Sequence, residues 1–193
     1  MANRLLSIGF DLDGVLLYNP ARIVRPIISF IKNIFIKKKG LSFYSPHTFW
    51  EKQLWRLFHK SSIFIAPGLD DIKKLIRTKK IKAYIITARY SYLKNDLKKW
   101  LKKMKINQSF SGIYYNQKDE QPHLFKEKMI RKLKLDLYIE DNWDIVKYLE
   151  SKVKSQKLKV FWIFNLLDRN INYKYKFPSL KNVIKYLTLA TSH

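Results

Sequence analysis

The chain has 193 residues, which suits one domain with a small insertion, and its hydrophobic fraction of 47% is enough to build a buried core. It contains no cysteine, which excludes disulfide bonds and thiolate metal sites. No apolar run approaches the roughly 18 residues that a membrane-spanning helix needs, and no signal peptide is recognisable, so we expect a cytoplasmic protein.

The formal net charge of +24 is extreme and suggests an anionic partner, which could be nucleic acid, a membrane surface or a phosphorylated substrate. Only 8 of the 39 basic residues are arginine, and the lysines are spread along the chain. This pattern favours a composition bias towards lysine over a dedicated nucleic-acid surface. The charge would still attract phosphate-bearing ligands and could bind nucleic acid nonspecifically.

Short apolar runs alternate with segments of helical spacing along most of the chain. The apolar run from Leu5 to Phe10 predicts a first buried strand, and Gly14 marks the turn after it. Further strands are predicted at residues 81–86, 110–115, 136–139 and 158–164, and helices at 70–78, 90–101, 122–133, 145–149 and 178–187. The alternation indicates an α/β fold, a Rossmann-like parallel sheet with helices on both faces.

The alternation is interrupted between the first strand and residue 66. Residues 23–39 show apolar side chains at helical spacing and end in Lys37-Lys38-Lys39-Gly40, which is typical of a helix stop. A second helix is predicted after Ser45-Pro46. We therefore predict a small helical cap at residues 19–65, inserted into a catalytic core of residues 1–18 and 66–193. The first cap helix could touch a membrane surface, although packing on the protein body is the simpler interpretation.

Polar side chains follow three of the predicted strands. Asp11 and Asp13 follow the first, Thr87 follows the second, and Glu140 and Asp141 follow the fourth. The carboxyl ends of parallel strands meet at one edge of a sheet, so these groups should lie together. Clustered carboxylates require a cation, and oxygen ligands suit Mg²⁺, which predicts a site for phosphoryl transfer. For Asp11 to Gly14 alone, an ordinary polar turn is the alternative.

The segment Asp11-Leu12-Asp13-Gly14-Val15 resembles the first motif of the haloacid dehalogenase (HAD) superfamily of phosphohydrolases. The resemblance implies that Asp11 is the nucleophile, which forms an aspartyl-phosphate. It also implies that Asp13 is the general acid/base and binds Mg²⁺ through its backbone carbonyl. Thr87 matches the second motif, whose hydroxyl binds the phosphoryl group. Glu140-Asp141 matches the fourth motif, with Asp141 as the main metal ligand and Glu140, which replaces the usual Gly or Asp, as a supporting acid.

The third motif of this superfamily is a phosphate-binding lysine with little sequence context. Lys126 lies fourteen residues before Glu140, a spacing similar to that of compact deoxynucleotidase-like members. Lys118 and Lys128 are alternatives in so lysine-rich a chain. Asp144 could assist the metal through water or cap the helix that follows, and the cap is the favoured interpretation.

Two groups of residues outside the motifs have open roles. Arg89, just after Thr87, could contact the substrate, or it could be a surface residue at the start of a helix. Trp50, Trp55 and Phe58 could line a substrate pocket, although an aromatic stripe on a helix more often belongs to a core. The histidines have no metal-ligand spacing.

The resemblance as a whole implies a Mg²⁺-dependent phosphatase acting on a small phosphate monoester, with a nucleoside monophosphate as the first candidate. The alternative is a nucleic-acid-binding or nucleic-acid end-processing protein on the same scaffold. The net charge supports that alternative, and the presence of a complete catalytic set opposes it.

Overall fold

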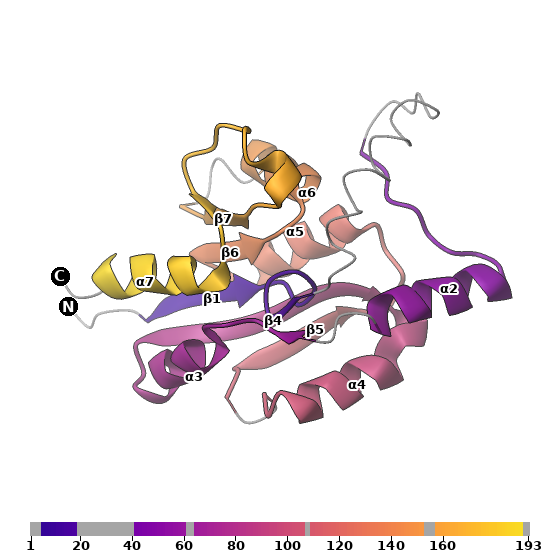
Figure 1. Cartoon of the computed structure of the whole chain (residues 1–193), viewed down its shortest axis with the longest axis horizontal. Coiled ribbons are helices and arrows are strands. Elements are labelled where there is room, and N and C mark those ends of the chain that lie inside the picture. The colour runs from indigo at the N-terminus through magenta and orange to yellow at the C-terminus, as the bar shows by residue number, and fades with distance from the viewer. Residues whose placement is uncertain (1–4, 19–40, 61–63, 107–108, 153–156, 191–193) are drawn as a thin grey trace.

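The computed structural model describes residues 5–18, 41–60, 64–106, 109–152 and 157–190. Its centre is a six-stranded sheet in the order β5-β4-β1-β6-β7-β8 (Figure 1). All neighbouring strands in this sheet are parallel. The strands are β1 (Leu6–Phe10), β4 (Ile81–Tyr90), β5 (Gly112–Asn116), β6 (Leu137–Glu140), β7 (Lys159–Ile163) and β8 (Lys176–Phe177).

Helices cover both faces of the sheet because its central strands are apolar on both sides. Successive residues of β4 face opposite sides of the sheet. One core contains Ala83 and Ile85, and the other contains Tyr84 and Ile86. The first core contains buried residues of α3 (Leu69–Arg77), α4 (Lys94–Lys103) and α7 (Leu180–Ala190). The second contains those of α5 (Pro122–Leu133) and α6 (Trp143–Lys152). The predicted α/β, Rossmann-like architecture is confirmed.

The cap prediction is only partly covered by the described residues. The second predicted cap helix is present as α2 (Phe49–Lys60), whereas the first, at residues 23–39, lies outside the described residues. A two-stranded antiparallel sheet of β2 (Leu17–Tyr18) and β3 (Phe64–Ile65) stands at the two ends of the insertion. Two-residue strands leave no periodic signal in a sequence, and we did not predict them. The cap boundaries at residues 19 and 65 stay a prediction.

The structure differs from the predicted elements in the length of one strand and in the presence of short elements that were not predicted. β4 runs on to Tyr90, so Thr87 and Arg89 belong to the strand, and its pairing with β5 shifts register between Thr87 and Tyr90. The short strand β8, which pairs with β7, and the short 3-10 helices at Ser91–Leu93 and Leu166–Asp168 were not predicted. A register shift of this kind redirects side chains, and here it lies at the predicted site.

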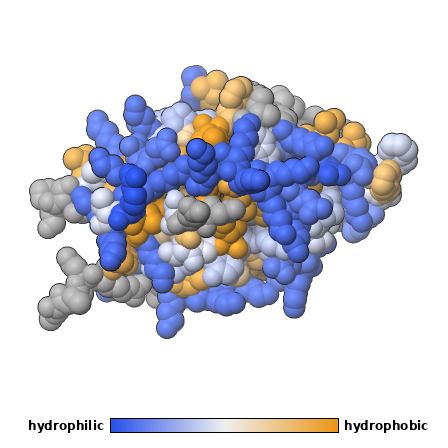
Figure 2. All heavy atoms as spheres, turned by 90° about the horizontal axis from the view of Figure 1, so that it is seen from below, coloured by the Kyte–Doolittle hydropathy of each residue, from blue (hydrophilic) through white to orange (hydrophobic). Residues whose placement is uncertain are grey.

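The surface carries the excess positive charge. Figure 2 shows hydrophilic side chains over much of the face seen from below, where α3 and α4 lie. The exposed lysines of α4 are Lys94, Lys98, Lys99, Lys102 and Lys103. Within the described part of the chain, no helix is long and apolar enough to cross a bilayer.

Candidate active site

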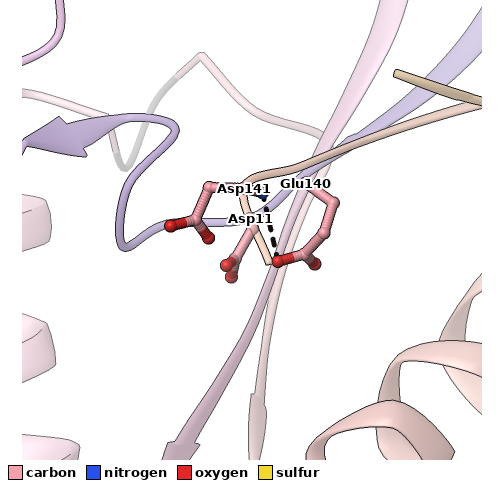
Figure 3. Close-up of side chains that lie close together, drawn as sticks. All are labelled: Asp11, Glu140 and Asp141. Atoms are coloured by element: carbon pink, nitrogen blue, oxygen red, sulfur yellow. Dashed lines mark hydrogen bonds between the residues drawn. The ribbon is translucent and has the colours of Figure 1, made fainter. Parts of the chain in front are cut away.

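Three carboxylates converge at the carboxyl ends of two neighbouring central strands. Asp11 directly follows β1, Glu140 is the last residue of β6, and Asp141 comes directly after it (Figure 3). One ligand oxygen from each residue lies within 4.8 Å of the others, and all three residues are buried. The backbone N–H of Asp11 donates to the carbonyl of Ile139 at 3.0 Å, which extends the pairing of the two strands to the site itself. The predicted edge of the sheet therefore does bring these acids together.

Lys126 of α5 reaches this cluster from the second face of the sheet. Its Nζ atom lies 2.7 Å from Glu140 Oε2 and 3.1 Å from Asp11 Oδ2, and its side chain is 3% exposed. Lys128 instead pairs with Glu120 at the surface, and Lys118 is exposed. Of the three candidate lysines, the structure thus brings only Lys126 to the carboxylates.

Glu140 organises the loop that follows β6. Its Oε2 accepts from Lys126, and its Oε1 accepts the backbone N–H groups of Asp141 at 3.2 Å and Asn142 at 3.0 Å. Figure 3 shows the bond from Glu140 to the Asp141 backbone. Trp162 donates from Nε1 to the Asp141 carbonyl at 3.2 Å. These bonds fix the backbone of Asp141, whose carboxylate lies beside Asp11.

The electrostatics of the cluster favour a divalent cation. Burial, opposed by Lys126, raises the pKa of Asp11 well above its ordinary value, and neighbouring Glu140 and Asp141 raise it further. Burial likewise raises the pKa of Glu140. Three buried carboxylates with one lysine leave negative charge that only protons or another cation can balance. Because hard oxygen ligands suit Mg²⁺, the side chains of Asp11, Asp141 and Glu140 fit such an ion.

The Asp13 side chain faces a different set of partners. Arg89 binds it through two hydrogen bonds, Nε to Oδ2 at 2.8 Å and Nη2 to Oδ1 at 2.7 Å. His59 of α2 also approaches this carboxylate, with Nδ1 3.5 Å from Oδ2. Burial alone would raise the pKa of Asp13, but the Arg89 charge and its hydrogen bonds hold that pKa well below the ordinary value. The structure therefore places this carboxylate against Arg89 and His59, outside the three-carboxylate cluster.

Thr87 and Gly14 shape the remainder of the site. Thr87 is buried on β4, next to β1, and its hydroxyl oxygen accepts the Arg89 backbone N–H at 3.3 Å. Gly14 has a φ of +89°, and a Cβ atom there would lie 2.1 Å from Asp141 Oδ2. The turn after β1 therefore needs glycine for two reasons, its backbone angle and the close approach of the carboxylate.

Sequence reasoning left two roles open for Arg89, a substrate contact or a surface residue, and it missed His59. Arg89 is almost completely buried, and so the surface interpretation is wrong. The only available signal was its position two residues after Thr87, at the carboxyl end of a central strand. His59 carried no signal, because its contact with Asp13 depends on how α2 packs.

Two lesser expectations also need correction. Asn142, rather than Asp144, caps α6: its Oδ1 accepts the backbone N–H groups of Asp144 at 3.0 Å and Ile145 at 3.4 Å. Asp144 pairs with Lys147 at 3.0 Å. Trp50 is 76% exposed, so it lines no pocket among the described residues, whereas Trp55 lies against the ring of His59.

Comparison with known proteins identifies the fold. No family model matches the chain, and no curated protein matches it in sequence. A HAD hydrolase of family IA, variant 3, from Entamoeba histolytica superposes with a TM-score of 0.57 at 12% identity, covering 94% of this chain and 100% of that one. A protein described as a predicted phosphoglycolate phosphatase from Haemophilus somnus gives 0.59 at 14% identity, with 97% and 100% coverage.

A third solved structure is CbbY from Rhodobacter sphaeroides in complex with phosphate, with a TM-score of 0.57, 10% identity and coverage of 93% and 96%. These similarities extend over nearly the whole chain. The chain therefore has the fold of the HAD-like hydrolases. In this chain, a buried charged cluster lies at the carboxyl edge of the sheet and consists of Asp11, Lys126, Glu140 and Asp141.

Proposed function

We propose that the protein is a Mg²⁺-dependent phosphatase that hydrolyses a phosphate monoester through an aspartyl-phosphate on Asp11. The observation that carries this proposal is the buried cluster of Asp11, Glu140 and Asp141 with Lys126 against two of its members. A buried structural ion pair would need one acid for one lysine. An excess of acids around a potential nucleophile is instead what metal-assisted phosphoryl transfer requires.

The proposed reaction has two steps. In the first, an Asp11 carboxylate oxygen forms a bond to phosphorus, the bond from phosphorus to the ester oxygen breaks, and a protonated Asp13 gives that oxygen its proton. In the second, Asp13 accepts a proton from water as the water oxygen attacks phosphorus, and the bond to Asp11 breaks. Arg89 favours the Asp13 carboxylate that the second step needs, and the first step therefore draws on a minor, protonated form of Asp13.

The other residues bind and orient the phosphoryl group. Lys126 would neutralise charge on its oxygens, and the Thr87 hydroxyl would donate a hydrogen bond to one of them. Asp11, Asp141 and Glu140, with the Asp13 backbone carbonyl, would hold Mg²⁺. When bound, this ion supplies charge neutralisation for the phosphoryl oxygens.

The substrate class is inferred from the spacing of two site residues. The spacing of Lys126 and Glu140 resembles deoxynucleotidase-like phosphatases, which makes a nucleoside monophosphate the first candidate. The cap would select the substrate, and we assign it residues 19–65, with the core formed by residues 1–18 and 66–193. α2 supports this division, because its residue His59 reaches Asp13 at the site.

The test is hydrolysis of nucleoside monophosphates, sugar phosphates and an oligonucleotide with terminal phosphates, with Mg²⁺ or with EDTA. Asp11→Asn should lower kcat by about 10³-fold or more, because it removes the nucleophile. The matched control is Asp70→Asn, since the Asp70 side chain is exposed on α3 and is not one of the proposed site residues. Activity that survives in Asp11→Asn or in EDTA would contradict the mechanism.

A further inference from the structure

Arg89 is a buried guanidinium at the candidate active site. Its side chain is 1% exposed, and it lies on β4 two residues after Thr87. A guanidinium carries five N–H donors in a rigid plane, and it cannot lose its charge. Asp13 accepts from Nε and Nη2, which accounts for only one edge of the group.

The opposite corner of the guanidinium is formed by its Nη1 group. Among the described residues, none accepts a hydrogen bond from Arg89 Nη1, although this atom is buried. A buried cationic donor without an acceptor is costly, and so such a group normally has a water or a ligand oxygen beside it. The guanidinium binds Asp13, which is two residues from Asp11 in the chain, and although burial opposes its charge, the carboxylates of Asp13 and Asp11 raise the pKa of Arg89.

We propose that Arg89 is a substrate-binding residue, whose Nη1 group donates to a phosphoryl oxygen while Nε and Nη2 hold Asp13. This inference rests on the proposed phosphatase function. A phosphoryl group attached to or approaching Asp11 presents several anionic oxygens, which planar guanidinium groups bind well. The same side chain then anchors the substrate and fixes the acid/base beside it.

The experiment measures binding of inorganic phosphate by calorimetry in the presence of Mg²⁺, which needs no turnover. Arg89→Gln should weaken phosphate binding by about 10-fold or more, the effect of losing a hydrogen bond from a charged group. Arg89→Lys should recover part of the affinity, because it keeps the charge without the fork. The matched control is Arg56→Gln, which removes the same charge from a pair with Asp96 at the junction of α2 and α4. This control should bind phosphate as the wild type does.

Asp13→Asn separates substrate binding from mere positioning of Asp13. If Nη1 binds phosphate, this variant should keep or increase phosphate affinity, because it removes a negative charge beside the site while Arg89 remains. If Arg89 acts only through Asp13, then Asp13→Asn should weaken phosphate binding as much as Arg89→Gln does. That second result would overturn the inference.

Folding is monitored by circular dichroism for each variant. Should Arg89→Gln unfold because it leaves Asp13 buried and unpaired, the double variant Asp13→Asn/Arg89→Gln replaces both charges with amides and is compared with Asp13→Asn alone. Equal phosphate affinity in these two variants would also overturn the inference. A folded wild-type protein that binds no phosphate would instead count against the phosphatase function itself.

Discussion

At the residue scale, burial and charge pairing decide what each ionisable group can do. Asp11 and Asp13 are two positions apart, yet the pKa of Asp11 is raised and that of Asp13 is lowered. The difference comes from their partners: Asp11 lies among other carboxylates, and Asp13 is bound by Arg89. Desolvation thus favours the neutral form of Asp11 in the metal-free protein, whereas the Arg89 charge favours the ionised form of Asp13.

Lys126 should be essential for the stability of the metal-free protein. Lys126→Met leaves Asp11 and Glu140 buried without their cation, and we expect a loss of about 3–5 kcal/mol in the free energy of unfolding. The check is urea denaturation in EDTA, with exposed Lys128→Met as the control. Added Mg²⁺ should restore part of the loss, because it supplies the missing positive charge. A variant as stable as the wild type in EDTA would contradict this assignment of charge.

His123 should make stability depend on pH. Burial lowers its pKa in the folded protein, and the unfolded chain therefore binds more protons between that pKa and about 6.5. The contribution of His123 to stability should be complete above pH 7 and fall as the solution is acidified through that window. Denaturation of His123→Phe at several pH values should show a weaker fall below neutral pH than the wild type.

The control for this prediction is Phe43→Leu, which changes a ring that packs against His123 without removing a titrating group. It should lower stability by a similar amount at every pH. If His123→Phe and the wild type keep parallel pH profiles, His123 is not responsible for the dependence.

At the element scale, the site is made by strand ends and the turns that follow them. β1, β4 and β6 are neighbours in the sheet, and each delivers one part of the site at its carboxyl end. α5 adds Lys126 from the second face, and α2 adds His59. The geometry therefore depends on tight turns, above all the turn at Gly14.

Gly14→Ala should damage the site more than the fold. The left-handed backbone angle costs about 1–2 kcal/mol for alanine, and the new methyl group would displace the Asp141 carboxylate. We expect Mg²⁺ binding, measured by calorimetry, to weaken by about 10-fold or more, as is typical when metal ligands lose their support.

Gly68→Ala is the matched control, because Gly68 also has a positive φ of +104° but precedes α3, and the nearest atoms to an added Cβ are backbone atoms of α7. This variant should lose similar stability and keep Mg²⁺ affinity. Equal loss of Mg²⁺ binding in the two variants would show that general destabilisation, rather than contact with Asp141, is the cause.

At the scale of the whole molecule, the net charge of +24 is the dominant long-range feature. The lysines of helices such as α4 are exposed on the outer faces, whereas the two cationic residues at the site, Lys126 and Arg89, are buried. This separation fits a composition bias with a general attraction for anions. The comparisons give no support to a nucleic-acid function.

Binding to DNA or RNA should be nonspecific and sensitive to salt. We expect retention of a labelled oligonucleotide at low ionic strength and its loss by about 0.15 M salt, as counterions screen the surface lysines. The Asp11→Asn variant should bind like the wild type, because the attraction arises outside the site. Sequence-selective binding that persists at that salt concentration would favour the nucleic-acid alternative.

The sequence by itself determined the α/β architecture, since buried strands alternating with amphipathic helices form a parallel sheet covered on both faces. It also predicted that Asp11, Glu140 and Asp141 would lie together, because strand ends in a parallel sheet share one edge, whereas the Asp13 side chain lies against Arg89 and His59. The sequence spacing favoured Lys126 among three lysines, and the tertiary structure shows that Lys126, and not Lys118 or Lys128, contacts the carboxylates, because the packing of α5 buries it there. The tertiary structure alone revealed that Arg89 and His59 meet at Asp13, because contacts between distant segments depend on packing, which local sequence patterns do not encode.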